Sequence, residues 1–204
     1  MNSTFWRAIK KMSDKEWNHI NFENLIIYML IAAILIHLFI IIYSRITGKR
    51  ITILREIIIQ LAVMYGIFIV DMTVLSRTVV YDDLFVANAI ASGQNQEQKA
   101  AGFLNILFFV PWGFILVFVQ KSSYMWKRVL MAACYSFLTS LAVELCQLIT
   151  KRGYFEFNDL EMNLAGGLVG AMLALLIIQL RRHCYNRQMI NHNKPEEKEN
   201  AGQK

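Results

Sequence analysis

The chain has 204 residues, of which 56% are apolar and 18% are charged. Soluble domains average about 45–50% apolar and about 25% charged residues, so this composition argues against a soluble enzyme. The formal net charge is +6, but the basic residues are spread over short segments between apolar runs. This placement favours anchoring at anionic lipid over nucleic-acid binding. The three cysteines have no spacing typical of a metal or redox site.

Five apolar runs are long enough to cross a hydrocarbon layer of about 30 Å as helices. They cover 25–43, 57–75, 103–119, 129–149 and 164–180. The segments between them are too short to build a core of their own. We therefore predict an all-α integral membrane protein, a bundle of five transmembrane helices with short loops.

The domain organisation that we predict is simple. Residues 1–24 are either an amphipathic helix lying in the membrane interface or an unstructured polar leader. Residues 25–180 form a single transmembrane domain. Residues 181–204 are a basic, disordered cytoplasmic tail, because the end of the chain has too little apolar content to order itself.

The distribution of Lys and Arg predicts the topology. Segments 44–56, 120–128 and 181–204 carry 13 of these residues, whereas 76–102 and 150–163 carry four. Cytoplasmic loops collect basic residues, so we expect the N-terminus outside and the C-terminus in the cytoplasm. The basic leader, with four such residues, points the other way.

Polar residues inside the spans are the most informative feature of this sequence, because they are costly in lipid and face a partner or a wet cavity. In the fourth span, Ser140, Glu144 and Gln147 lie on one helix face. The fifth begins with Asp159 and Asn163, and small residues from Gly166 to Gly170 allow a neighbouring helix to approach closely. The same glycine face is also a candidate surface for contact with a second copy.

The topology brings polar residues from four spans to one rim, because the ends of the second and fourth spans and the starts of the third and fifth lie on the same side. The residues at this rim, the outer one by the charge count, are Asp71, Arg77, Asn105, Glu144, Gln147, Arg152, Asp159 and Asn163. We predict a ligand-binding site from this set without Asp71. We expect no metal ion and no cofactor in it.

Structural roles remain open for the individual members. Glu144 can form an ion pair with Arg77 or Arg152. Gln147 and Asn163 can form ordinary interhelical hydrogen bonds, and Asn105 can cap the third helix. His37, the lone histidine of the first span, is expected to hydrogen-bond a neighbour.

Several motifs of this chain resemble those of the VanZ-like family, over about residues 57–180. They are Ser76-Arg77 and the segments 105–114, 144–147, 152–153 and 158–170. The resemblance implies a bacterial multi-pass plasma-membrane protein associated with tolerance to glycopeptide antibiotics, above all lipid-tailed ones such as teicoplanin. It implies no settled chemistry.

Three functions remain open at this stage. In the first, a non-enzymatic membrane factor binds a lipid-linked wall precursor or a lipid-tailed drug, with Arg77 and Arg152 holding a phosphate or carboxylate. In the second, the cluster is an active site on a lipid or cell-wall intermediate, with Glu144 as general base and Asp159 as a helper. The third is a transporter or assembly partner. The partners that we expect are membrane lipids and this precursor or drug.

Overall fold

The computed structural model describes residues 3–77, 79, 96–153 and 155–192. They form α1 (Ser3–His19), α2 (Phe22–Thr47), α3 (Ile53–Val70), the short π-helix η1 (Asp71–Leu75), α4 (Gln96–Val119), α5 (Met125–Thr150) and α6 (Phe157–His192). Five of the described segments are long and apolar enough to cross a membrane. The predicted bundle of five transmembrane helices is confirmed, and the chain is a multi-pass membrane protein.

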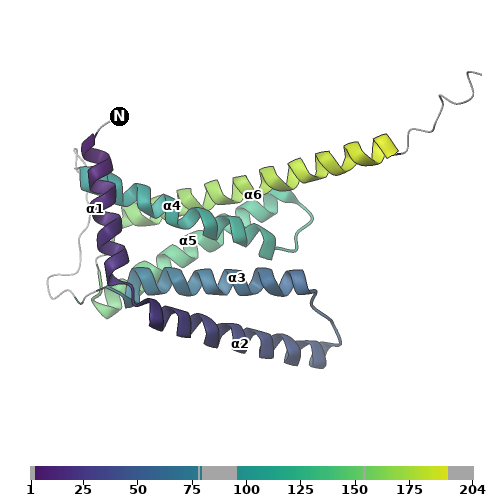
Figure 1. Cartoon of the computed structure of the whole chain (residues 1–204), viewed down its shortest axis with the longest axis horizontal. Helices are drawn as coiled ribbons and strands as arrows, with labels where there is room; N and C mark the ends of the chain where they lie inside the picture. The colour runs from purple at the N-terminus through teal and green to yellow at the C-terminus, as the bar shows by residue number, and fades with distance from the viewer. Residues whose placement is uncertain (1–2, 78, 80–95, 154, 193–204) are drawn as a thin grey trace, which may run out of the picture.

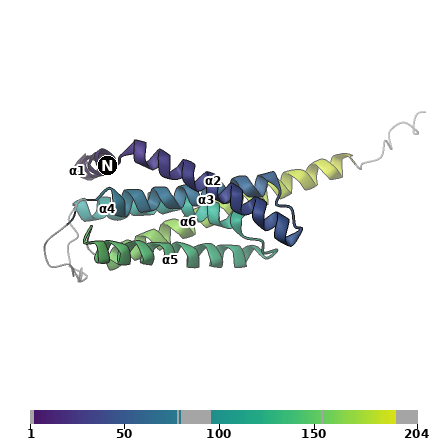
Figure 2. The same cartoon turned by 90° about the horizontal axis from the view of Figure 1, so that it is seen from below.

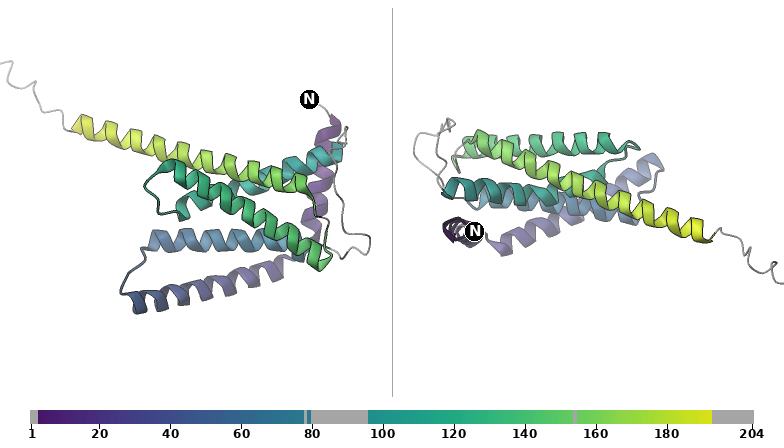
Figure 3. Two further views of the ribbon diagram at one scale, coloured as in Figure 1. Left: turned by 180° about the vertical axis from the view of Figure 1, so that it is seen from behind. Right: turned by 90° about the horizontal axis from the view of Figure 1, so that it is seen from above.

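Helices α2 to α6 run side by side in alternating directions (Figure 1). Helix α2 packs on α3, which in turn packs on α4, whereas α6 packs on both α4 and α5 (Figure 3). Helix α2 buries only Leu25 and Ile40, so most of its apolar surface faces outward. This arrangement places the end of η1, the start of α4, the end of α5 and the start of α6 at one end of the bundle.

Glycines bring the backbones of α4 and α6 into direct contact. A Cβ atom on Gly170 would lie 1.9 Å from the carbonyl oxygen of Val110, and one on Gly166 would lie 2.3 Å from that of Ile106. The face of α6 that we considered for contact with a second copy is therefore covered by α4 of the same chain. Gly167 lies next to these two glycines and faces Ser136 of α5.

Aromatic side chains fill the space between α3, α4 and α5. Tyr65 stacks on Trp112 with a ring-centroid distance of 6.3 Å, and its hydroxyl donates to the carbonyl oxygen of Phe108 at 2.7 Å. The indole Nε1 of Trp112 donates to Thr139 Oγ1 at 3.2 Å. These bonds satisfy the polar atoms of both rings, as buried tyrosine and tryptophan require.

Each of the five helical segments extends beyond its predicted span, and α6 does so by the most residues. Helix α4 begins at Gln96 instead of 103, and α6 runs from Phe157 to His192 instead of 164–180. Residues 181–192 are therefore helical in the structure, where we expected the start of a disordered tail, and 193–204 lie outside the described residues. The predicted spans were too short because hydropathy detects only the apolar part of a helix. The hydrogen-bonded helix continues into polar residues at its ends.

Helix α1 lies across the end of the bundle at which α4 and α6 begin (Figure 1), and it is viewed nearly end-on in Figure 2. It contacts α4, where Phe5 packs edge-to-face on Phe103 with ring centroids 6.2 Å apart. At its other end Trp17 lies 6.4 Å from the ring of Phe68 on α3. Of the two alternatives for this leader, the structure has the helix.

Candidate functional site

The predicted site residues all lie toward one end of the bundle, around the turn between α5 and α6 (Figure 1). We refer to them as the polar cluster. Its members are Arg77, Asn105, Glu144, Gln147, Arg152, Asp159 and Asn163. Glu144, Gln147 and Asn163 are 1%, 2% and 6% exposed, respectively. Three polar side chains are thus fully enclosed, and each needs compensating partners.

Glu144 joins the end of α5 to the start of α6. Its carboxylate oxygen Oε2 accepts a hydrogen bond of 2.9 Å from the backbone N–H of Glu156, the residue directly before α6. The carbonyl oxygen of Glu156 in turn accepts from the N–H of Asp159 at 3.1 Å. The Glu144 carboxylate therefore lies at a helix N-terminus, where unpaired N–H groups and the helix dipole favour negative charge.

Arg77 is the cation whose charge acts on both the buried Glu144 and the half-buried Asp159. It attracts both Glu144 and Asp159, whereas Glu156 repels both of them. Asp159 also accepts a hydrogen bond from the side chain of Asn105. Since Asn105 lies well inside α4, it does not cap that helix, as one alternative had it.

Arg152 has a different partner. Its NH1 donates to the carbonyl oxygen of Leu75 at 2.5 Å, and the side-chain Nε2 of Gln147 donates to that of Thr73 at 2.9 Å. Both acceptors belong to η1, the last turn of its helix, whose carbonyls have no intrahelical partner. Gln147 and Arg152 thus hold the end of η1 against the end of α5. Of the two arginines expected beside Glu144, Arg77 fits that role.

The π-helix η1 explains how these carbonyls become available. Its wider turn is closed by the N–H of Ser76, which donates to the carbonyl oxygen of Asp71 at 2.8 Å. The hydroxyl of Ser76 donates to Asp71 Oδ2 at 3.1 Å, and Asp71 is 4% exposed. Single π-turns inside α-helices occur often at functional sites.

Asn163 fixes the contact between α5 and α6 one turn deeper. Its Nδ2 donates to Ser140 Oγ at 2.8 Å. Gln147 and Asn163 therefore form the interhelical hydrogen bonds expected of them, but each has a second polar atom. The side-chain oxygens Gln147 Oε1 and Asn163 Oδ1 are buried with no hydrogen-bond partner.

Glu156 was missed by the sequence analysis, although it affects both buried carboxylates. The available signal was its place one residue before the start of α6, where a backbone N–H needs an acceptor. In the part of the chain that the structure describes, no three His, Cys, Asp or Glu side chains are grouped so that they could hold a metal ion.

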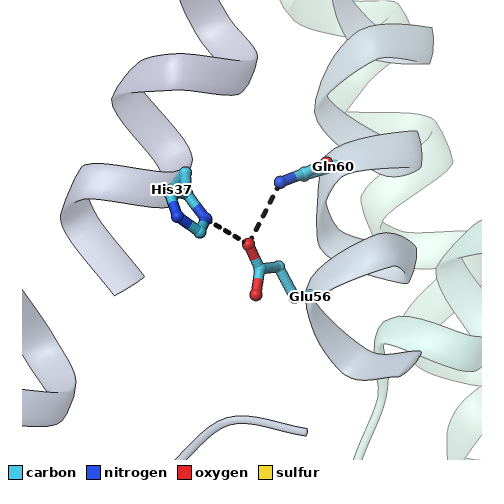
Figure 4. Close-up of polar contacts among 3 residues, drawn as sticks. All are labelled: His37, Glu56 and Gln60. Atoms are coloured by element: carbon cyan, nitrogen blue, oxygen red, sulfur yellow. Dashed lines mark hydrogen bonds and ion pairs between the residues drawn. The ribbon is translucent and has the colours of Figure 1, made fainter. Parts of the chain in front are cut away.

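A second polar contact lies near the opposite end of the bundle. His37 Nδ1 is 2.5 Å from Glu56 Oε1, which also accepts from Gln60 Nε2 at 3.3 Å (Figure 4). His37 is 57% exposed. The expectation that this histidine bonds a neighbour is confirmed, and the contact joins α2 to α3 away from the polar cluster.

Comparison with models of protein families shows which family this chain belongs to. A model of the VanZ/LLP1 family matches residues 25–178. The chain belongs to the VanZ/LLP1 family. This match confirms the resemblance and corrects its extent, since it includes α2, which we placed outside the family motifs. It spans every member of the polar cluster and leaves α1 outside. Searches of curated proteins and of solved structures gave no match.

Proposed function

We propose that this VanZ/LLP1 protein lowers the susceptibility of a bacterium to lipid-tailed glycopeptide antibiotics of the teicoplanin type. In this proposal it acts as a non-enzymatic membrane factor that binds the drug or a lipid-linked cell-wall precursor at the polar cluster. The observation that carries the proposal is the convergence of buried polar residues from η1, α5 and α6 around Glu144, with the half-buried Asn105 of α4 beside them. Such residues inside a membrane bundle are costly, and are typical of ligand sites.

The depth of the cluster below the end of α5 supports a ligand with a lipid tail. Glu144 lies six residues before the end of α5, about 9 Å along the helix axis. A headgroup at this depth keeps its tail in the hydrocarbon layer beside the bundle. We propose that the cluster faces the outside of a bacterial cell membrane, as the basic residues of the loops at the other end favour.

Growth inhibition tests the proposal directly. The gene is expressed in a susceptible Gram-positive host, and inhibition by a lipid-tailed and by an untailed glycopeptide is compared with an empty-vector strain. We expect the expressing strain to have a higher inhibitory concentration than the empty-vector strain for the lipid-tailed drug, and an unchanged one for the untailed drug. Equal protection against both drugs, or protection against neither, contradicts it.

A matched pair of variants links the effect to the cluster. Glu144→Gln removes a buried charge within it, whereas Glu161→Gln removes an exposed one two residues from Asp159 on α6. We expect the first variant to abolish protection at normal membrane abundance and the second to preserve it.

One observation favours an enzyme as the second candidate. Glu144 and Asp159 lie close enough to repel one another, and paired carboxylates can share general acid–base work. In this case the cluster acts on a lipid or cell-wall intermediate with Glu144 as general base. Mass spectrometry of lipid and wall-precursor extracts tests it: a species that depends on the gene and disappears in Glu144→Gln supports catalysis.

A further inference from the structure

The end of the bundle opposite the polar cluster is strongly basic. The segments at this end, 44–56, 120–128 and 181–192, carry ten Lys and Arg residues and one acidic residue, Glu56. Glu56 is bonded to His37 of α2. The other two segments contribute positive charge alone, so this end of the molecule attracts anions.

Helix α6 projects past the other helices at this end (Figure 1). The backbone contact between Gly170 and Val110 makes the end of α4, nine residues further on, level with about residue 179 of α6. The hydrogen bond between Asn163 and Ser140 makes the start of α5 level with about residue 178. Two independent contacts thus agree on where the bundle ends along α6.

The face of α6 that is buried in the bundle continues into the projecting part. Ala174 is fully buried, and Ile178 packs against the same core. In the next two turns this face carries Arg181, Arg182 and Tyr185, which are exposed. An open hollow of about 500 Å³ lies here, lined by Ile178, Arg181, Arg182, Tyr185 and Asn186.

Aromatic side chains indicate that this end lies at the membrane interface. Tyr124 and Trp126 at the start of α5 are 61% and 63% exposed, and Lys127 Nζ lies 4.8 Å and 5.5 Å from their ring centroids. Tyr and Trp gather at the level of the lipid headgroups. Since the start of α5 is level with about residue 178 of α6, Arg181 and Arg182 follow within about one turn of that level.

The surface of α6 that leads to these arginines is apolar. Ile177 and Leu173 lie four and eight residues before Arg181, on one helix face, and they are 42% and 44% exposed. A lipid can therefore lay an acyl chain along this strip while its headgroup reaches the arginine. An acidic protein segment would match the charge but would leave the strip uncovered.

We propose that Arg181 and Arg182 form a binding site for an anionic phospholipid, whose phosphate accepts hydrogen bonds from the two guanidinium groups and whose acyl chain lies along Leu173 and Ile177. Arginine recognises phosphate through paired N–H donors. Basic residues directly beyond a transmembrane span are typical of anionic lipid sites. The site lies at the end opposite the polar cluster and does not depend on the proposed function.

Native mass spectrometry of the full chain tests the proposal. The protein in a non-ionic detergent is titrated with phosphatidylglycerol and with phosphatidylcholine that has the same acyl chains. We expect saturable binding of phosphatidylglycerol, at least about tenfold tighter than that of phosphatidylcholine, because only the first lipid carries a net negative charge. Equal affinities, or no saturable binding of phosphatidylglycerol, overturn the inference.

Variants locate the binding. Arg181→Gln and Arg182→Gln are each expected to weaken phosphatidylglycerol binding by about fivefold or more, the effect of one basic residue at an anionic lipid surface. Arg187→Gln is the matched control, since it removes the same charge from the projecting helix but is not among the described residues that line the hollow. We expect it to change the affinity by less than about twofold. All three side chains are exposed, so the fold should be preserved.

Two results would overturn the site at these arginines. One is an equal loss of affinity in Arg187→Gln, which indicates diffuse attraction to the whole basic end. The other is unchanged affinity in both Arg181→Gln and Arg182→Gln.

A soluble competitor separates a lipid from a free phosphate ligand. Glycerophosphoglycerol is the headgroup of phosphatidylglycerol without its acyl chains. We expect it not to displace the lipid at equal concentration, because the apolar strip then contributes to binding. Full displacement at equal concentration would identify a soluble anion as the ligand and overturn the assignment to a lipid.

Discussion

Glu144 Oε2 accepts a hydrogen bond of 2.9 Å from the backbone N–H of Glu156 across the turn between α5 and α6. One buried side chain therefore has two separable tasks. As an acceptor it fixes the start of α6, and as a charge it sets the electrostatics of the polar cluster. A substitution that keeps the acceptor but removes the charge separates the two.

Glu144→Gln and Glu144→Leu should consequently behave differently. The amide oxygen of glutamine can still accept from Glu156, so we expect normal abundance without antibiotic tolerance. Leucine leaves that buried N–H unsatisfied, which costs about 1–3 kcal/mol, so membrane abundance should fall as well. Quantitative immunoblots of membranes, read beside growth inhibition, check both. Full tolerance in Glu144→Gln at normal abundance would remove Glu144 from the site.

The charge partner of Glu144 can be identified by double substitution. Arg77 attracts the buried Glu144 and the half-buried Asp159, so Arg77→Gln removes their cation and should destabilise the protein by at most about 3–5 kcal/mol, the cost of breaking a fully buried pair. We expect Glu144→Gln to recover part of that loss. The measurement is the thermal unfolding midpoint of the purified protein in detergent.

The corresponding cycle with Arg152→Gln is the comparison. Because Arg152 donates to the Leu75 carbonyl, its loss should be independent of Glu144, and the two effects should add. If Glu144→Gln restored the unfolding midpoint of Arg152→Gln but not that of Arg77→Gln, Arg152 and not Arg77 would be the charge partner of Glu144.

Gly170→Ala tests the contact between α4 and α6. Its Cβ would lie 1.9 Å from the Val110 carbonyl oxygen, so the helices must separate, and overpacking of this kind costs about 1–3 kcal/mol or more. Gly66→Ala is the matched control within α3, because its Cβ would lie 3.6 Å from Trp112, an ordinary contact. We expect a lower unfolding midpoint for Gly170→Ala and an equal or higher one for Gly66→Ala, since alanine favours the helix. Equal midpoints would contradict the close approach.

The orientation in the membrane can be tested by cysteine labelling in a chain without Cys134, Cys146 and Cys184. Ser92 lies outside the described residues, in the segment that joins η1 to α4, and Ser122 lies between α4 and α5. With the cluster outside, an impermeant maleimide labels Ser92→Cys in intact cells and Ser122→Cys only after lysis. The opposite pattern would move the cluster to the cytoplasmic side.

The number of spans and their alternation followed from the sequence because each apolar run has membrane length. That pattern also placed Glu144, Gln147, Asp159 and Asn163 at one end, since helix direction is set by the order of the spans. The ends of the helices were harder to predict, because α4 and α6 continue as hydrogen-bonded helix through polar residues.

The partners within the cluster could not be predicted, because they depend on backbone geometry that residue spacing does not encode. Lys151 adopts a left-handed φ of 56° and Gly153 a φ of 152°, and this turn determines where Arg152 and Glu156 lie. Likewise, no residue pattern predicted the π-turn η1, whose Thr73 and Leu75 carbonyls face the end of α5.

Helix α6 has a mechanical consequence for the whole molecule. It is a single helix that carries Asp159 and Asn163 at one end, contacts α4 through Gly166 and Gly170, and extends past the rest of the bundle at the other (Figure 3). From Gly170 to His192 the lever arm is about 33 Å. Each degree of tilt about the glycine pivot therefore swings the far tip by about 0.6 Å. A tilt of α6 about this contact would therefore move its far end about twice as far as its start at Asp159.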